Sequence, residues 1–136
     1  MAGGRLLTVS ARAAALPPVV VGTDPNCACC EGWVRHVRQA GFSVRVQESS
    51  DMAAVKKARH VPDEMQSCHT AVIGGYVIEG HVLASDVTRL VTERPSACGL
   101  AVPGMPASAP GMDRPGETYT VMLSGTPDGD QPYAHH

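Results

Sequence analysis

The sequence predicts an α/β fold with the element order β-α-β-α-β-β-α, followed by a C-terminal extension. Three observations predict this fold. Strand-like apolar runs alternate with segments of helical periodicity, a Gly-Gly pair separates two further strand-like runs, and a Pro- and Gly-rich segment follows them. The chain has 136 residues, of which 43% are apolar, and this is enough for one domain with a modest core.

The first strand and the first helix are predicted near the beginning of this pattern. Val19–Val21 reads as a short buried strand, and Thr23–Asn26 is a turn in which Asp24 or Asn26 can cap a helix. Gly41 ends the helix as a residue that tolerates left-handed backbone. Apolar residues recur at helical spacing in between, at Trp33, Val34, Val37 and Ala40.

The second strand and the second helix follow directly. Phe42, Val44 and Val46 alternate with polar residues, which is the period of a half-buried strand. Ser49–Asp51 supplies capping residues for a second helix that runs to about Arg59.

A hairpin and a third helix complete the pattern. Thr70–Ile73 and Tyr76–Glu79 flank Gly74-Gly75, which is a strong signal for a two-residue hairpin turn. The third helix is predicted to start at Ser85-Asp86 and to end near Glu93.

This order of elements, with a C-x-x-C pair at the start of the first helix, is the thioredoxin-like arrangement. We therefore divide the chain into a leader remnant or disordered tail over residues 1–18, a thioredoxin-like metal-binding domain over residues 19–95, and an extension over residues 96–136. The extension is predicted to carry a Pro/Gly/Met-rich loop and an added strand or hairpin that packs on the same domain. Its strand is Tyr119–Leu123, and a turn at Asp128-Gly129 leads to a closing hairpin.

Composition and the N-terminal residues bear on location and partners. Ala11–Ala13 fits the A-x-A form of a secretory cleavage site, so we favour an exported protein over a cytosolic one with a disordered tail. The net charge of −2 and the scattered basic residues give no reason to expect nucleic acid as a partner. No run approaches the roughly 20 apolar residues of a membrane span. His135 and His136 are either native or a tag remnant and carry no functional argument.

Three clustered cysteines, Cys27, Cys29 and Cys30, carry the main chemical signal. Thiolates are soft ligands that select Cu(I), Zn(II) or iron–sulfur clusters, and the N-terminus of a helix stabilises their charge. The sulfur of Cys29 should project away from the C-x-x-C pair, so one tetrahedral ion cannot easily bind all three. Together with Cys68, they suit a polynuclear, sulfur-bridged site better than one closed structural zinc site. The alternative is that one or two of them are inert buried cysteines.

The pair Cys68-His69 enters the third strand, where a thioredoxin-like chain faces the start of the first helix. Oxidoreductases of that fold place a proline at this point, whereas this chain offers a thiol and an imidazole, and both can bind metal. Because the next two strands are antiparallel, His81 should return to the same edge, either as a ligand or partner of the site or as an ordinary loop histidine. His69 could instead be a polar strand residue whose hydrogen bonds are satisfied.

Met105 and Met112 lie in two Pro-Gly-Met repeats and are the remaining candidate ligands. Thioethers suit copper better than zinc, although methionine more often fills gaps in a core. Cys98 is expected to be a small buried residue. Met52 and Met65 are expected to be packing residues, and His36 and His60 to be surface residues of helices.

The sequence resembles the CopG-type copper-resistance proteins, a family of small exported bacterial metal-binding proteins, over about Val19 to Met112. The resemblance rests on the segments Cys27–Trp33, Ser67–Val82, Gly99–Pro106 and Pro110–Met112. It implies a thioredoxin-like fold, a periplasmic location, a thiolate-rich site for several copper ions, and a role in copper handling or Cu(I)/Cu(II) redox chemistry. Cys98 is not part of the family pattern.

We therefore predict a copper-binding protein of copper resistance. Its partners would be metal ions and other periplasmic copper-handling proteins. The core ligands would be Cys27, Cys29, Cys30 and Cys68, with His69 and Met105 completing the site and Met112 and His81 as peripheral ligands. The rival hypothesis is a thiol–disulfide oxidoreductase, in which Cys27 attacks and Cys30 resolves. A structural zinc domain is disfavoured, since the core is sufficient without one.

Overall fold

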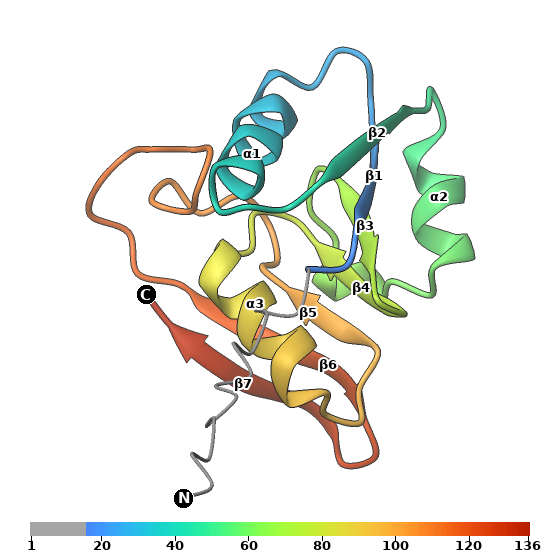
Figure 1. Cartoon of the computed structure of the whole chain (residues 1–136), viewed down its shortest axis with the longest axis vertical. Helices are drawn as coiled ribbons and strands as arrows, with labels where there is room; N and C mark the ends of the chain where they lie inside the picture. Colours follow the sequence, from blue (N-terminus) through green and yellow to red (C-terminus); the bar gives the residue numbers. More distant parts are fainter. Residues whose placement is uncertain (1–15) are drawn as a thin grey trace, which may run out of the picture.

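The structure is a computed structural model that describes residues 16–136, so most of the expected leader lies outside the described part. It confirms the α/β fold and the predicted order of the first seven elements (Figure 1). The elements are β1 (Val19–Thr23), α1 (Ala28–Gln39), β2 (Val44–Glu48), α2 (Met52–Ala58), the 3-10 turn η1 (Asp63–Met65), β3 (Thr70–Ile73), β4 (Tyr76–Glu79), α3 (Ala84–Glu93), β5 (Gly99–Ala101), β6 (Thr120–Thr126) and β7 (Gly129–His135).

The strands form one sheet in the order β2-β1-β3-β4-β5-β6-β7. β1 pairs with β2, and β4 with β5, in parallel, whereas the other neighbours are antiparallel. Gly22 of β1 lies opposite Thr70 of β3, and Thr70 lies opposite Glu79 of β4. The end of β1, the start of β3 and the end of β4 therefore lie side by side at one end of the strands. The segments that carry Cys27, Cys68-His69 and His81 adjoin the strands at this end.

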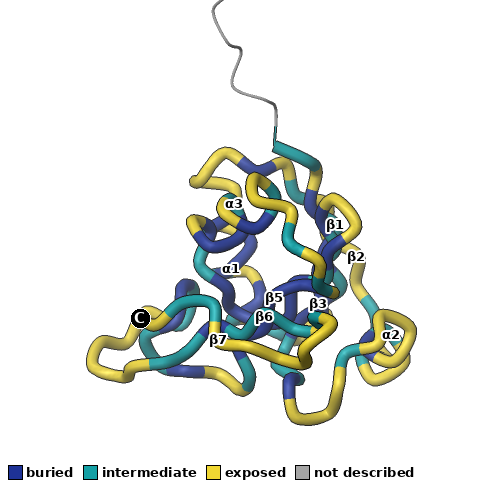
Figure 2. Tube along the Cα trace, turned by 90° about the horizontal axis from the view of Figure 1, so that it is seen from below, coloured by how far each residue is buried: buried dark blue, intermediate teal, exposed yellow. Residues whose placement is uncertain are grey.

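The helices cover both faces of the sheet. On one face, α1 and α3 pack their apolar sides against the central strands, with Trp33 and Leu90 among the fully buried side chains. On the other face lies α2 (Figure 1), whose Val55 would contact a side chain added at Gly22. Burial concentrates between α1, α3 and the central strands, while α2 and β7 are largely exposed (Figure 2). None of the helices formed by residues 16–136 has the length and apolar character that a membrane crossing requires.

Several local predictions are confirmed and others are wrong. Asp51 caps α2 by accepting a hydrogen bond from the Ala54 N–H. The expected cap of α1 is wrong, because the N-cap is Cys27, and Asp24 instead accepts from the Asn26 N–H within the turn. β2 is a strand, but it lies at the sheet edge and is mostly exposed rather than half-buried.

The C-terminal extension continues the same sheet. β6 and β7 form the predicted hairpin, and β5 is an additional short strand that the sequence pattern did not indicate. Cys98 is exposed and not buried as expected, because it precedes β5 and lies beside the left-handed Gly125. His136 belongs to the fold, since it exchanges backbone hydrogen bonds with Tyr119.

Candidate metal centre

Three cysteines occupy the first turn of α1. Cys27 is the N-cap, and its side chain makes no capping hydrogen bond. Cys29 and Cys30 follow at the second and third helical positions, where backbone N–H groups lack helical partners. Cys27 and Cys30 are joined by a disulfide, which the C-x-x-C spacing makes geometrically easy. As thiolate ligands, these two sulfurs become available only after that disulfide is reduced.

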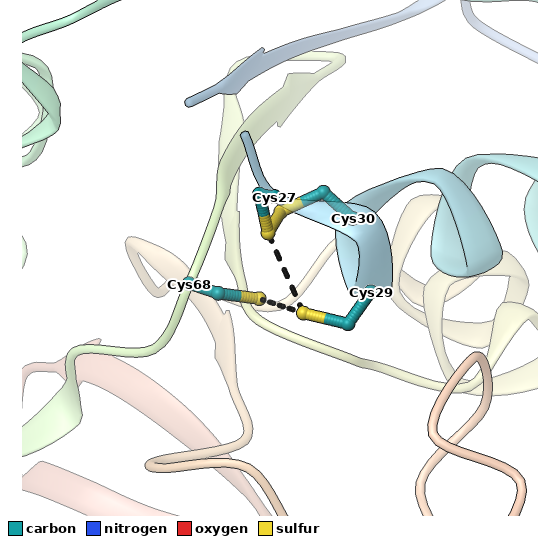
Figure 3. A group of neighbouring side chains, drawn as sticks. All are labelled: Cys27, Cys29, Cys30 and Cys68. Carbon is teal, nitrogen blue, oxygen red and sulfur yellow. Dashed lines mark hydrogen bonds between the residues drawn. A yellow bond between two sulfur atoms is a disulfide. The ribbon is translucent and has the colours of Figure 1, made fainter. Parts of the chain in front are cut away.

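The two remaining thiols of the cluster face each other across the start of α1 and the start of β3. The Sγ atom of Cys29 lies 3.4 Å from that of Cys27 and 3.8 Å from that of Cys68 (Figure 3). Two sulfurs that each lie about 2.3 Å from one tetrahedral ion are separated by about 3.8 Å. The pair Cys29 and Cys68 therefore has the spacing of two ligands on a common metal ion. All four sulfurs lie within 4.8 Å of one another, so the expectation that the Cys29 sulfur projects away from the C-x-x-C pair is wrong.

His81 brings an imidazole to the same thiol. Its Nε2 lies 3.1 Å from Cys68 Sγ, and its Nδ1 lies 2.7 Å from the Pro110 carbonyl oxygen. A carbonyl oxygen can only accept a hydrogen bond, so Nδ1 of His81 carries the proton and donates a hydrogen bond to the Pro110 carbonyl. Nε2 then presents its lone pair toward Cys68, the arrangement in which a metal-ligating histidine is held by a backbone carbonyl. Burial lowers the pKa of His81, which keeps the ring neutral.

His69 is the second imidazole beside Cys68, 5.0 Å from His81 between ring centroids, and it is fully buried against the indole of Trp33. Its Nδ1 is 3.2 Å from Cys68 Sγ, and its ring centroid is 4.4 Å from that of Trp33. Among the described residues, its Nε2 has no hydrogen-bond partner, although buried polar atoms normally have one. Burial lowers the pKa of His69 to about 3, helped by His81 and Lys56. The imidazole is therefore neutral at physiological pH, as a metal ligand must be.

Cys68 is the one residue common to both groups of potential ligands. Cys27, Cys29, Cys30 and Cys68 form the first group, and Cys68, His69 and His81 form the second. Burial, together with the neighbouring Cys29, raises the pKa of Cys68 to about 12. Without metal the group is a thiol, so metal binding must release its proton. The donor set of soft thiolates and neutral imidazoles fits copper.

The Pro/Gly-rich loop closes over one side of the site. A Cβ at Gly111 would come within 2.6 Å of the Trp33 backbone nitrogen and 3.1 Å of His81 Nδ1, so this approach requires glycine. The loop thereby places the Pro110 carbonyl against His81. Met112 is partly buried next to this contact, whereas Met105 is 49% exposed.

A buried polar network that the sequence analysis missed fixes the residues on either side of Cys68-His69. Glu79 is 1% exposed and accepts hydrogen bonds from Lys56 Nζ at 2.6 Å, from the Ser67 N–H at 2.9 Å and from Thr70 Oγ1 at 2.5 Å. The contacts to Ser67 and Thr70 flank Cys68-His69 on both sides. A single glutamate within the apolar strand β4 was the available signal, and Lys56 of α2 supplies the charge that balances it.

Glu79→Ala is expected to lower the free energy of unfolding by about 3–5 kcal/mol, because it leaves the buried ammonium of Lys56 without its partner. Chemical denaturation measures this change. The matched control is Glu93→Ala, which removes the exposed ion pair with Arg89 and should cost less than about 1 kcal/mol. Equal losses in the two variants would show that Glu79 has no special structural role.

His36 is a second residue that the sequence analysis placed differently. It was expected to be a surface residue, but it is half-buried, and its Nε2 accepts a hydrogen bond from the Ala84 N–H at the start of α3. Burial lowers its pKa. His36 therefore links α1 to α3 and does not join the donor groups described above.

Comparison with known proteins places this chain in a family. Two solved structures of a copper resistance protein CopG, form 2 and form 1, superpose on the chain with TM-scores of 0.83 and 0.82. Each is 40% identical in sequence, and each alignment covers 89% of this chain and 98% of that chain. The chain belongs to the CopG copper-resistance protein family.

A second comparison covers the part of the site that follows α2. The family model described as a protein of unknown function, DUF411, matches residues 65–112. This range contains Cys68, His69 and His81 together with Met105 and Met112. No curated protein matches the sequence. Membership of the CopG family and the Cys/His cluster together support copper binding.

Proposed function

We propose that this CopG family member is a periplasmic copper-binding protein of copper resistance or homeostasis, which holds more than one copper ion in a cysteine-rich site. The observation that carries the proposal is the position of Cys68, whose sulfur belongs to both donor groups. Cys27, Cys29, Cys30 and Cys68 would be the core ligands, with His69 and His81 as nitrogen ligands. Copper would reach the site from other periplasmic copper-handling proteins.

The spacing of the sulfurs supports a polynuclear site. Cys29 Sγ lies 3.4 Å from Cys27 Sγ and 3.8 Å from Cys68 Sγ. The two donor groups together contain six donors, four sulfurs and two imidazoles, which is more than one ion of four or fewer ligands can use. Thiolates that bridge neighbouring Cu(I) ions would use all of them. The sulfurs lie at one edge of the donor set and the imidazoles at the other, on either side of Cys68.

The mixed donor set also supports redox activity at the metal. Thiolate ligands favour Cu(I), whereas neutral imidazoles suit Cu(II) as well. Both imidazoles are held in place by buried contacts, His81 by Pro110 and His69 by Trp33. Copper could therefore change oxidation state without a large rearrangement of its ligands.

The disulfide between Cys27 and Cys30 favours a second candidate function, a thiol–disulfide oxidoreductase. In that function, the pair exchanges with a substrate disulfide through a mixed disulfide at Cys27, and Cys30 resolves it. This chemistry needs neither Cys68 nor the two buried histidines, and for this reason we place it second.

Metal analysis distinguishes the two functions. The reduced protein, purified without added metal, is titrated with Cu(I) and with Zn(II) against competing chelators, and insulin reduction is assayed in parallel. Copper binding should be tight and preferred to zinc, with slow insulin reduction. Fast insulin reduction together with weak copper binding would favour the oxidoreductase.

Met105 and Met112 are proposed as outer thioether ligands that close the site when copper is bound. Met105→Leu should change stability by less than about 1.5 kcal/mol, because the side chain is exposed and the replacement is similar in volume. Copper release or the copper redox potential should nevertheless change. Unaltered copper affinity, release rate and potential would show that Met105 takes no part in the site.

A further inference from the structure

A cavity of about 570 Å³ opens beside the disulfide, between α1 and the ends of β1 and β2. Its volume falls within the range of about 300–1,000 Å³ that is typical of small-molecule sites. Cys27 and Cys30 both line the cavity, whereas Cys29 and Cys68 do not. Figure 3 shows the sulfurs of Cys29 and Cys68 together on one side of the disulfide. The cavity thus reaches the disulfide and not the other two thiols.

The two cysteines of the disulfide differ in exposure. Cys30 is 1% exposed, whereas Cys27 is partly exposed at the start of α1. A reagent in the cavity would therefore attack the sulfur of Cys27. The leaving sulfur, Cys30, lies in the first turn of a 12-residue helix, whose N-terminus stabilises a thiolate.

The charges around the cavity have both signs. Arg35 and Arg38 line it from α1, and the acidic residues are Asp24, Glu31 and Glu48. Arg38 donates a hydrogen bond to the Val44 carbonyl, whereas Arg35 makes no ion pair within residues 16–136. Val34 and Val46 supply an apolar part of the wall. A ligand that fits this lining is small and carries both a carboxylate and an ammonium group.

We infer that this cavity binds a small thiol with carboxylate and ammonium groups and delivers its sulfur to Cys27. This inference rests on the proposed function, in which Cys27 and Cys30 bind copper. They can do so only as thiolates, after the disulfide is reduced. The cavity would therefore be the entry for the reductant that opens the copper site.

The reaction balances with two thiols. The thiolate of the first forms a bond to Cys27 Sγ, and the Cys27–Cys30 bond breaks with its electron pair on Cys30 Sγ, which takes up a proton. A second thiolate attacks the sulfur of the bound first thiol and releases Cys27 as a thiolate, which is then protonated or bound by metal. Two thiols are oxidised to one disulfide, and one protein disulfide is reduced to two thiols.

The test measures reduction of the disulfide in metal-free protein. Glutathione is the probe with charges of both signs, and 2-mercaptoethanol is the neutral probe. The reaction is stopped with acid and an alkylating agent, and free Cys27 and Cys30 are quantified by mass spectrometry. Rates are compared at equal thiolate concentration, because the two thiols ionise differently.

We expect the rate to saturate with glutathione and to rise linearly with 2-mercaptoethanol. Arg35→Gln should slow reduction by glutathione about two- to fivefold at low concentration, the range of one exposed ion pair, and leave 2-mercaptoethanol unaffected. The matched control is Arg45→Gln, which removes an exposed arginine of β2 that does not line the cavity.

The inference would be overturned if glutathione showed linear kinetics, or if Arg35→Gln slowed both thiols or neither of them. Arg45→Gln with the same effect as Arg35→Gln would also overturn it, since a general loss of positive charge would then be the cause. No copper is present in this assay, so its failure is distinguishable from failure of the proposed copper site, which the metal titration tests separately.

Discussion

Cys68→Ser should reduce copper affinity by more than about a hundredfold, because it removes the sulfur that both donor groups share. Residues that only orient a metal ligand already contribute about 10- to 100-fold to affinity, and loss of the ligand itself should exceed that range. The measurement is a competition titration with a Cu(I) chelator under anaerobic conditions. Serine is close to cysteine in size, so far-UV circular dichroism should show an unchanged fold.

The matched control is Cys98→Ser. Cys98 is an exposed free thiol that joins neither donor group, so its replacement should leave the affinity unchanged. Cys68→Ser also separates the two candidate functions, since exchange at Cys27 and Cys30 needs only that pair. Normal copper affinity in Cys68→Ser, together with fast insulin reduction by the unmodified protein, would establish the oxidoreductase as the better description.

Copper capacity should fall when the Cys27–Cys30 disulfide is intact. The oxidised protein offers Cys29 and Cys68 with two imidazoles, whereas the reduced protein adds two thiolates at the start of α1. We therefore expect fewer Cu(I) ions per chain in the oxidised form. Anaerobic titration of both forms, with free thiols counted beforehand, measures the difference.

A double variant gives an independent control for this dependence. Cys27→Ser/Cys30→Ser cannot form the disulfide and lacks both sulfurs, so its capacity should equal that of the oxidised protein with or without reductant. If the oxidised and reduced proteins took up the same number of ions, Cys27 and Cys30 would not be ligands.

Much of the site could be predicted because local signals fix where strands begin and end. The turn before α1 puts the C-x-x-C pair at a helix start. The Gly74-Gly75 hairpin makes β3 and β4 antiparallel, and it thereby returns His81 to Cys68. These inferences need only the period of a strand and the direction of its neighbour.

Other features depend on contacts between segments that no local pattern reveals. Lys56 and Glu79 stand on different elements, and each alone resembles a surface charge, but together they form a buried ion pair. β5 is three residues long, too short for any periodicity, and exists because β4 and β6 supply partners on both sides. Cys98 lies just before this unpredicted strand, and it is exposed.

X-ray absorption spectroscopy of the reduced, Cu(I)-loaded protein tests the central claim most directly. The sulfur of Cys29 lies in contact distance of the sulfurs of both Cys27 and Cys68, so bridging thiolates should hold neighbouring copper ions close together. We expect Cu–S scattering accompanied by Cu–Cu scattering, with more than one Cu(I) ion per chain. A single ion per chain, with sulfur ligands and no Cu–Cu scattering, would contradict the proposed polynuclear copper site.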